Sequence, residues 1–584
     1  MRWQEHARTT IAFLIFLPSI FLPPCLHSLP FCCFIPVWML HKNTFARLVL
    51  KGLVMLRLIP SVLIGCCLAF AGRPSTHATA ADQIKADVLL TGGTVHDGAG
   101  STGRVADVAI ADGRIVAVGD SKNVNAVWTI DCSGLVVCPG FIDLHNHSDR
   151  QVVKPETRLV ANFLTQGCTT IVTGNCGSGP VDAAEYYSQI DEHGAGPNVA
   201  HLLPQGSLRG HVRGSGLGEA SERDMQKMLD LTDKAMRDGV WGMSTGLIYV
   251  PSSYASTDEL TAIAKVVSKH GGIYASHIRG EGTGLLQSVE EALQIGRDAD
   301  LPVHISHFKS SGRDAWGLVR EAARMIAQER ELGRAVTADQ YPYIASSTSL
   351  DATLLPSWAR AGGRGDLIKR LDSKDKGPEL RKIVAESIEK KNDGDAVRIV
   401  RYSPKRQWVG LSLLDIAKAE KRKPIDIAYE IFRGGGASIV NFSMNEDDVR
   451  HIMAIDFVAT ASDGRAYLPG ADRPHPRNYG TFPRKIGYYS LKENVLPLEA
   501  AIRSATGLPA EILGLKDRGY LRVGLAADIT VFDPKTMKDE ATFDAPHQYS
   551  SGIRYVFVNG TPAIVAADVT GALAGLSLRK SNTH

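Results

Sequence analysis

The stretch Pro139-Gly140-Phe141-Ile142-Asp143-Leu144-His145-Asn146-His147 decides the fold class, because an apolar strand here ends in two histidines one residue apart. Side chains alternate along a strand, so His145 and His147 share a face and can converge on one cation. Two exposed loop histidines are the alternative, and the preceding Pro-Gly-Phe-Ile-Asp disfavours it. Barrel enzymes keep their sites at the carboxyl ends of their strands. The stretch therefore predicts a strand that presents metal ligands in an α/β barrel.

The rest of the chain extends this prediction to a (β/α)8, TIM-like barrel. Strand-like and helix-like segments alternate over residues 139–513, which indicates parallel strands joined by crossover helices. Residues from about 357 to 433 are more charged and helical, so we expect an insertion that covers the barrel mouth. Short β-rich runs in 81–138 and 514–565 predict one small β-sandwich built from both ends of the chain. A C-terminal tail is expected over 566–584.

Residues 1–80 are interpreted as a leader. The segment 11–40 is apolar but contains five prolines, which would break a spanning helix repeatedly. A better export signal begins at Met55, where an arginine, an apolar run and small residues suited to cleavage follow one another. We expect translation to start at Met55 or Met39 and the protein to be exported to the periplasm or beyond. A lipid anchor at Cys66 and a retained membrane anchor are the alternatives.

Composition limits the classes of partner. The 65 basic and 62 acidic side chains give a net charge of +3 without a long basic run, so a nucleic-acid partner is not expected. Beyond the leader there are four cysteines, too few for a disulfide scaffold. We expect most of them to be buried thiols, and the glycines around Cys176 favour a ligand there. A small-molecule substrate is expected, and no oligomeric state is predicted.

Further motifs follow along the chain, and in this order they resemble the N-acyl-D-amino-acid deacylase (D-aminoacylase) family of the amidohydrolase superfamily. The resemblance covers nearly all of residues 85 to 570. The motifs are Gly174-Asn175-Cys176-Gly177, Ser276-His277-Ile278-Arg279-Gly280-Glu281, Ile305-Ser306-His307-Phe308-Lys309, Asp339-Gln340-Tyr341-Pro342-Tyr343, Ser462-Asp463-Gly464 and His475-Pro476-Arg477.

The resemblance implies one tight Zn²⁺ site and a second, weaker metal position. A thiolate with two imidazoles is a good zinc donor set that leaves a fourth position for water. The implied ligands of the tight site are Cys176, His277 and His307, and the residues that border the weaker position are His145, His147 and Asp463. His304 competes with His307, but Lys309 follows His307 as in the family, so His304 is expected to be a supporting residue.

The implied reaction is zinc-dependent hydrolysis of N-acyl-D-amino acids, which releases a carboxylate and a D-amino acid. Zinc lowers the pKa of bound water from about 15.7 to about 7, so zinc-bound hydroxide is the expected nucleophile. Asp463, before Gly464, is expected to act as general base and then general acid. In isolation a Ser-Asp-Gly sequence would more often be a turn.

The resemblance assigns Lys309, Tyr343 and Arg477 to the substrate's carboxylate and reacting carbonyl, and a planar guanidinium suits a carboxylate. Ser349 is expected to assist, with Ser346 and Ser347 as alternatives. An apolar segment, Leu354-Leu355-Pro356-Ser357-Trp358, favours a neutral or hydrophobic amino-acid side chain, although Arg360 and Arg364 follow closely.

Three other functions are compatible with parts of the sequence. A D-specific dipeptidase would share the carboxylate clamp and differ in its acyl pocket. A cyclic-amide hydrolase of the hydantoinase type is expected to carry a carboxylated lysine, whereas the third barrel strand here ends in Cys176. A non-catalytic barrel-fold binding protein would be expected to lack some of the ligands, and all six are present.

Overall fold

The computed structural model describes residues 83–581. The expected leader, with its export signal and anchors, lies outside the described residues. Within those residues, no helix combines the length and the apolar character that crossing a membrane requires.

Eight parallel strands in the described part of the chain form the barrel. Two parallel sheets, β6-β7-β8 and β10-β11-β12-β13-β17, make up the wall, with the short β9 (Leu203–Pro204) beside β10. The Trp241 amide donates to the His201 carbonyl at 2.9 Å, and the Asp463 amide donates to the His145 carbonyl at 2.8 Å. These bonds join the two sheets at both seams, so the expected barrel is confirmed. Its strands are β6 (Phe141–Asp143), β7 (Cys168–Thr173), β8 (Asn198–His201), β10 (Gly242–Gly246), β11 (Ile273–His277), β12 (Val303–Ile305), β13 (Val336–Gln340) and β17 (Val458–Thr460).

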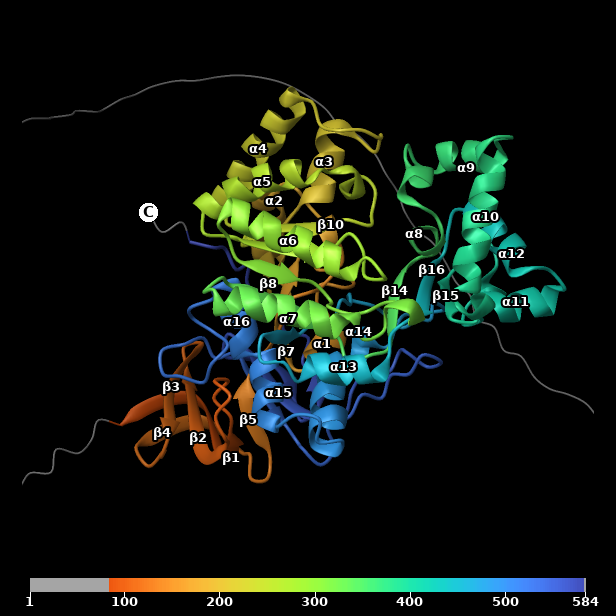
Figure 1. The fold of residues 1–584 in the computed structure, drawn as a ribbon. Helices are drawn as coiled ribbons and strands as arrows, with labels where there is room; N and C mark the ends of the chain where they lie inside the picture. Colours follow the sequence, from red (N-terminus) through yellow and green to blue (C-terminus); the bar gives the residue numbers. More distant parts are fainter. Residues whose placement is uncertain (1–82, 582–584) are drawn as a thin grey trace, which may run out of the picture. The chain divides into compact units, whose positions relative to one another are not determined.

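Amphipathic helices cover the outside of the barrel. In α5 the buried Leu260, Ile263, Ala264 and Val267 recur at helical spacing, and the Ser256 side chain caps the first turn. Figure 1 shows successive helices following one another around the strands. Apolar burial on this face and inside the barrel thus fixes the strand ends that carry the site. The helices are α2 (Ala183–His193), α4 (Glu222–Arg237), α5 (Thr257–Lys269), α6 (Leu285–Ala299), α7 (Leu318–Glu331), α13 (Glu446–Met453), α15 (Leu498–Ala505) and α16 (Gly507–Leu513).

Both ends of the described chain build a separate nine-stranded sheet. The strand order is β21-β20-β19-β18-β5-β1-β2-β3, and β4 pairs with β1. The antiparallel pairing of β5 with β18 joins the N-terminal and C-terminal halves. The strands are β1 (Ile84–Val95), β2 (Arg104–Ala111), β3 (Arg114–Gly119), β4 (Val124–Asp131), β5 (Val136–Pro139), β18 (Ile529–Phe532), β19 (Ile553–Val558), β20 (Thr561–Val565) and β21 (Asp568–Val569).

The segment expected to be a C-terminal tail is instead packed on the protein. Strand β21 continues the sheet, and the chain then runs beside the start of β8. The Val199 amide donates to Leu576, the Leu578 amide donates to Val199, and the Trp241 indole donates to the Leu578 carbonyl at 2.7 Å. Backbone pairing of this kind depends on a partner strand that is distant in the sequence, so the sequence of the tail does not predict it.

The insertion is larger and less helical than the expected 357–433. A three-stranded antiparallel sheet, ordered β14-β16-β15, forms its base and was not predicted. A hydrophobic core of its own unites this sheet with the inserted helices, and Figure 1 shows these helices standing to one side of the barrel. The elements are β14 (Ala345–Ser349), α8 (Leu350–Leu354), α9 (Arg364–Asp372), α10 (Lys376–Glu389), β15 (Val397–Arg401), α11 (Leu413–Glu420), α12 (Pro424–Arg433) and β16 (Ser438–Phe442).

Candidate active site

Three of the expected site residues have a left-handed backbone. The φ angles are 51° at Cys176, 38° at His307 and 49° at Asp463. Such a conformation costs a non-glycine residue about 1–3 kcal/mol, and it persists where the surrounding structure requires it. Each of the three directly follows a barrel strand or the turn after it, so the strained turns aim the side chains across the carboxyl end of the barrel.

The Cys176 thiol lies among imidazoles. Its Sγ atom is 3.2 Å from His145 Nε2, 3.6 Å from His307 Nε2 and 3.7 Å from His277 Nδ1. The Gly174 backbone before it leaves no room for a side chain, because an added Cβ would lie 2.0 Å from the Leu202 carbonyl. The expected tight set of Cys176, His277 and His307 is therefore brought together, and His145 lies closer to the thiol than either of the other two.

Electrostatics favour an ionised thiol. Burial opposes ionisation, but the imidazoles of His145, His147 and His277 outweigh it and hold the pKa of Cys176 well below the ordinary thiol value. The same balance acts in reverse at His145, where burial is outweighed by the neighbouring Cys176 and Asp339 and the pKa is raised. A thiolate among imidazoles is the form in which cysteine binds metals.

Asp463 connects a second group of ligands to Arg477. One carboxylate oxygen is 3.1 Å from His147 Nε2 and 3.6 Å from His145 Nε2, and the other is 2.8 Å from Arg477 Nη1. Burial would raise the pKa of Asp463, but Arg477 and the histidines hold it well below its usual range. The carboxylate is therefore ionised and able to accept a proton.

Asp339 supports the site from within the barrel. Its Oδ1 accepts the His307 amide at 2.7 Å, and its Oδ2 lies 2.8 Å from His304 Nε2 and 3.4 Å from His145 Nδ1. Carboxylates in this position fix the tautomer and orientation of a ligating histidine. His304 is thus placed as a supporting residue behind Asp339, as expected.

Glu281 was not recognised in the sequence analysis as a site residue. Its Oε1 lies 2.9 Å from His307 Nδ1 and also pairs with the Lys309 ammonium, which itself lies 2.8 Å from His307 Nδ1. Burial opposes ionisation of Glu281, but Lys309 and His307 lower its pKa strongly. Its place four residues after His277, within the same motif, was the available signal.

Tyr343 does not face the metal-binding side chains. The Tyr343 hydroxyl is close to Gly480, and Asp539 and Arg484 are the charges that act on it. The Tyr343 amide donates to the Tyr341 carbonyl at 3.0 Å. This hydrogen bond closes a tight turn at Pro342, which changes the direction of the chain. Tyr341 takes the site position instead: Arg477 lies 4.7 Å and Lys309 5.8 Å from its ring centre.

Ser349, which was also expected to contact the substrate, acts as a helix cap. It is exposed, and its hydroxyl accepts the Ala352 amide as the N-cap of α8. Thr348 precedes Ser349 in strand β14, and its hydroxyl lies 3.0 Å from the Tyr249 hydroxyl. The Tyr249 ring centre lies 5.2 Å from that of the His277 ring. Alternation along β14 puts Ser346 on the Thr348 face. Tyr249, in the loop after β10, had no recognisable motif.

The donor set fits zinc. Three overlapping groups have ligand atoms within 4.8 Å of one another. The His277 Nε2 atom is buried without a hydrogen-bond partner among the described residues. Thiolate, imidazole and carboxylate together are the donors that zinc prefers. The groups are His145, Cys176 and His307; His145, His147 and Asp463; and His277, Glu281 and His307.

Comparison with known proteins gives a consistent result. The amidohydrolase family profile matches residues 128–349 and 447–564, on either side of the insertion. A D-aminoacylase of Alcaligenes xylosoxydans xylosoxydans is 35% identical over 85% of this chain and 98% of its own. A D-aminoacylase structure, described for one-metal activation and second-metal attenuation of its binuclear centre, is 33% identical with a TM-score of 0.73 over 85% and 100% of the two chains.

A second solved structure is that of N-acyl-D-glutamate deacylase from Bordetella bronchiseptica, complexed with zinc and a phosphonate inhibitor that mimics the tetrahedral intermediate of the reaction. It is 32% identical, with a TM-score of 0.73 over 85% of this chain and 100% of the other.

Proposed function

Because this chain belongs to the N-acyl-D-amino-acid deacylases of the amidohydrolase family, we propose that it hydrolyses the amide bond of N-acyl-D-amino acids, releasing a carboxylate and a D-amino acid. The observation that carries this proposal is the gathering of Cys176, His277, His307 and Asp463 with Arg477 at one end of the barrel. The linear amide is favoured over a cyclic one because a cysteine stands where a cyclic-amide hydrolase is expected to have a carboxylated lysine.

Zn²⁺ is the cofactor. Cys176, His277 and His307 would hold it tightly, and His145, His147 and Asp463 would border a weaker second position. When bound, zinc supplies Lewis acidity that polarises the amide carbonyl and lowers the pKa of water. Cys176 lies within 3.7 Å of histidines from both groups, so it is positioned to serve either.

Asp463 moves the protons. Its ionised carboxylate accepts one from the attacking water and passes it to the amide nitrogen as the C–N bond breaks. Arg477, 2.8 Å away, holds the pKa of this carboxylate low before the reaction. Asp463 follows the last barrel strand, and its left-handed backbone directs the side chain between His147 and Arg477.

Arg477, Lys309 and Tyr341 hold the substrate. The buried Arg477 guanidinium suits the α-carboxylate, because its planar fork matches two oxygens. Lys309 is paired with Glu281 and lies 5.8 Å from the centre of the Tyr341 ring, so it supplies the second positive charge. The buried Tyr341 hydroxyl has no hydrogen-bond partner among the described residues and is available to the reacting carbonyl.

We propose a neutral or hydrophobic D-amino acid as the leaving group. The segment 354–358 is apolar, which suits such a side chain. Of the two cations that follow it, Arg364 pairs with Asp351 at 2.8 Å and donates to two backbone carbonyls, so it is occupied within the protein. Arg360 donates to the Ile248 carbonyl at 2.7 Å, and its Nε has no hydrogen-bond partner among the described residues.

The test is a screen of N-acetyl-D-leucine, N-acetyl-D-glutamate, their L-enantiomers and L-Xaa-D-Xaa dipeptides against purified protein. We expect turnover of the D-acylamino acids, with leucine preferred to glutamate. Cleavage of L-enantiomers or of cyclic amides in their place would refute the deacylase assignment. Preference for dipeptides would identify a D-specific dipeptidase, and an absence of both zinc and turnover would indicate a non-catalytic barrel.

Export is a further proposal, supported by the signal-like sequence that starts at Met55. Fractionation of cells that express the full chain tests it. We expect deacylase activity in the periplasm or medium and a shortened N-terminus by mass spectrometry. Activity that stays in the cytoplasm on an uncleaved chain would contradict export.

A further inference from the structure

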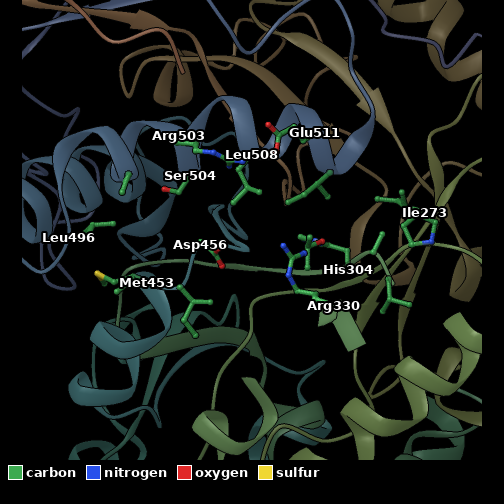
Figure 2. A pocket seen from close by; sticks show the side chains of 18 residues that line it. Ile273, His304, Arg330, Met453, Asp456, Leu496, Arg503, Ser504, Leu508 and Glu511 are labelled. Atoms are coloured by element: carbon green, nitrogen blue, oxygen red, sulfur yellow. Dashed lines mark hydrogen bonds and ion pairs between the residues drawn. The ribbon is translucent and has the colours of Figure 1, made fainter. Parts of the chain in front are cut away.

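A cavity of about 450 Å³ lies at the amino end of the barrel, opposite the metal-binding side chains. Ile273 and Val303, the first residues of β11 and β12, line one side of it, and α15 and α16 line another. Figure 2 shows His304 and Arg330 on one side of this space and Arg503, Leu508 and Glu511 on the other. The volume is within the range of about 300–1,000 Å³ typical of small-molecule sites.

The lining combines an apolar wall with guanidinium groups. Apolar side chains such as Met453, Leu496, Leu508 and Ile512 form most of it. Each methylene of a ligand that such a wall removes from water makes binding more favourable by about 0.8 kcal/mol. The occupant is therefore expected to carry a hydrocarbon chain.

One buried hydrogen-bond donor is left over among the residues that line this cavity. Arg503 uses Nη2 to bind Glu511 at 2.8 Å, while its buried Nη1 has no hydrogen-bond partner among the described residues. Arg330 is exposed to solvent; its Nη1 donates to the Val336 carbonyl at 2.8 Å and its guanidinium stacks on Phe457.

The acids of the cavity leave the Arg503 Nη1 donor open. Glu511 is bound by both Arg503 and the Tyr520 hydroxyl, and Asp456 is exposed to solvent. A buried donor without an acceptor costs free energy that an oxygen anion recovers. A single carboxylate beside Arg503 satisfies this requirement.

One wall of the cavity is connected to the active site. His304 and Thr337 both line it, and their side chains are 2.9 Å apart. From His304 the contacts continue to Asp339 at 2.8 Å, and Asp339 binds the His307 amide and approaches His145. A ligand that shifts His304 therefore acts on the groups that orient two metal-binding histidines.

We propose that this cavity is a second binding site, which takes an amphipathic monocarboxylate, with its chain against the apolar wall and its carboxylate at Arg503. Occupancy changes turnover through His304 and Asp339 without excluding the substrate. The released acyl acid has this chemistry when its chain is long; that link rests on the proposed function, whereas the binding site itself does not.

Calorimetric titration of the zinc-loaded protein with octanoate and with 1-octanol tests the site. Ala500→Phe fills the cavity and is expected to weaken binding of both probes at least tenfold. Arg503→Gln is expected to weaken octanoate about tenfold and to leave octanol within about twofold. Arg324→Gln, on an exposed arginine of α7, is the matched control and should change neither.

Octanoate that binds equally to all four proteins would overturn the site, as would inhibition competitive with the substrate, which would place octanoate in the active site. Octanoate that binds but leaves kcat unchanged would refute the connection through His304. If the protein proved to have no deacylase activity, the calorimetric result would still decide the binding site, so the two proposals fail separately.

Discussion

Both ends of the barrel contain non-glycine residues with a left-handed backbone, but these residues have different roles at the two ends. At the carboxyl end, left-handed residues such as Cys176, His307 and Asp463 carry the reacting groups. At the amino end, left-handed residues such as Asp300 terminate helices, as the C-cap of α6 does. The left-handed conformation therefore positions reacting groups at the carboxyl end, whereas at the amino end it ends a helix.

The largest effect should come from Cys176→Ala, which removes the atom around which four histidines gather. We expect zinc content to fall to background and kcat/KM to fall by roughly 10⁴-fold or more. Elemental analysis and turnover measure this. Cys168→Ala, which removes a buried thiol from β7 outside the cluster, should retain zinc. Equal zinc loss in both variants would mean that Cys176 is a packing residue.

Asp463→Asn should separate metal binding from proton transfer at the same end. Zinc should stay, because Cys176, His277 and His307 are intact, while kcat falls by about 10²–10⁴-fold. The readouts are bound zinc and steady-state rates. A variant that turns over at the wild-type rate would remove Asp463 from the proton pathway.

Glu281→Gln should weaken zinc affinity by about 10–100-fold, because a carboxylate that orients a ligating histidine is lost. Competition with a chelator measures the affinity. Glu290→Gln, an exposed glutamate on α6, is the control and should leave the affinity unchanged. Unaltered zinc affinity in both variants would show that Glu281 pairs with Lys309 but does not orient His307.

Tyr341→Phe and Tyr343→Phe test the placement of the two tyrosines. The first should lower kcat/KM by about 10-fold or more, since it removes a hydrogen bond worth about 1.5–3 kcal/mol to a charged group. The second should change kcat/KM by less than about threefold. A larger loss of kcat/KM in Tyr343→Phe than in Tyr341→Phe would show that Tyr343 is the tyrosine that contacts the substrate.

The smallest effect concerns Lys485, whose ammonium donates to the carbonyl of Met453, a residue of the amino-end cavity. Burial lowers the pKa of Lys485 to about 7 from its usual 10.5. Between these values the unfolded chain binds more protons, so stability rises with pH; below pH 7 both states are protonated and the penalty is complete. From pH 7 to pH 9 the gain is about 1–3 kcal/mol.

The stability of the Lys485→Met variant should not show this rise with pH. Comparing the thermal midpoints of the two proteins at pH 7 and pH 9 separates the contribution of Lys485 from that of other titrating groups. Parallel pH profiles for the two proteins would contradict the buried, neutral lysine.

The strand period and the motif order predicted the barrel and most of the site, because His145, Cys176, His277 and Asp463 each end or follow a buried strand. The structure does not bring the expected Tyr343 and Ser349 to the metal-binding side chains, and the reasons are local. The tight turn at Pro342 exchanges Tyr343 for Tyr341, and helix capping removes Ser349. Glu281 acts through His307 and Lys309, which follow another strand, so its place four residues after His277 indicates it only weakly.

The chain leaves and re-enters the barrel around the insertion at one point, since the Met444 amide donates to the Ile344 carbonyl at 3.1 Å. The unit has its own core, and it also contacts the barrel loops through Tyr249 and Ile248, so it can change inside while these contacts keep its position over the barrel. Substitutions within the core of this unit can therefore alter substrate choice, while the metal ligands on the barrel strands stay in place.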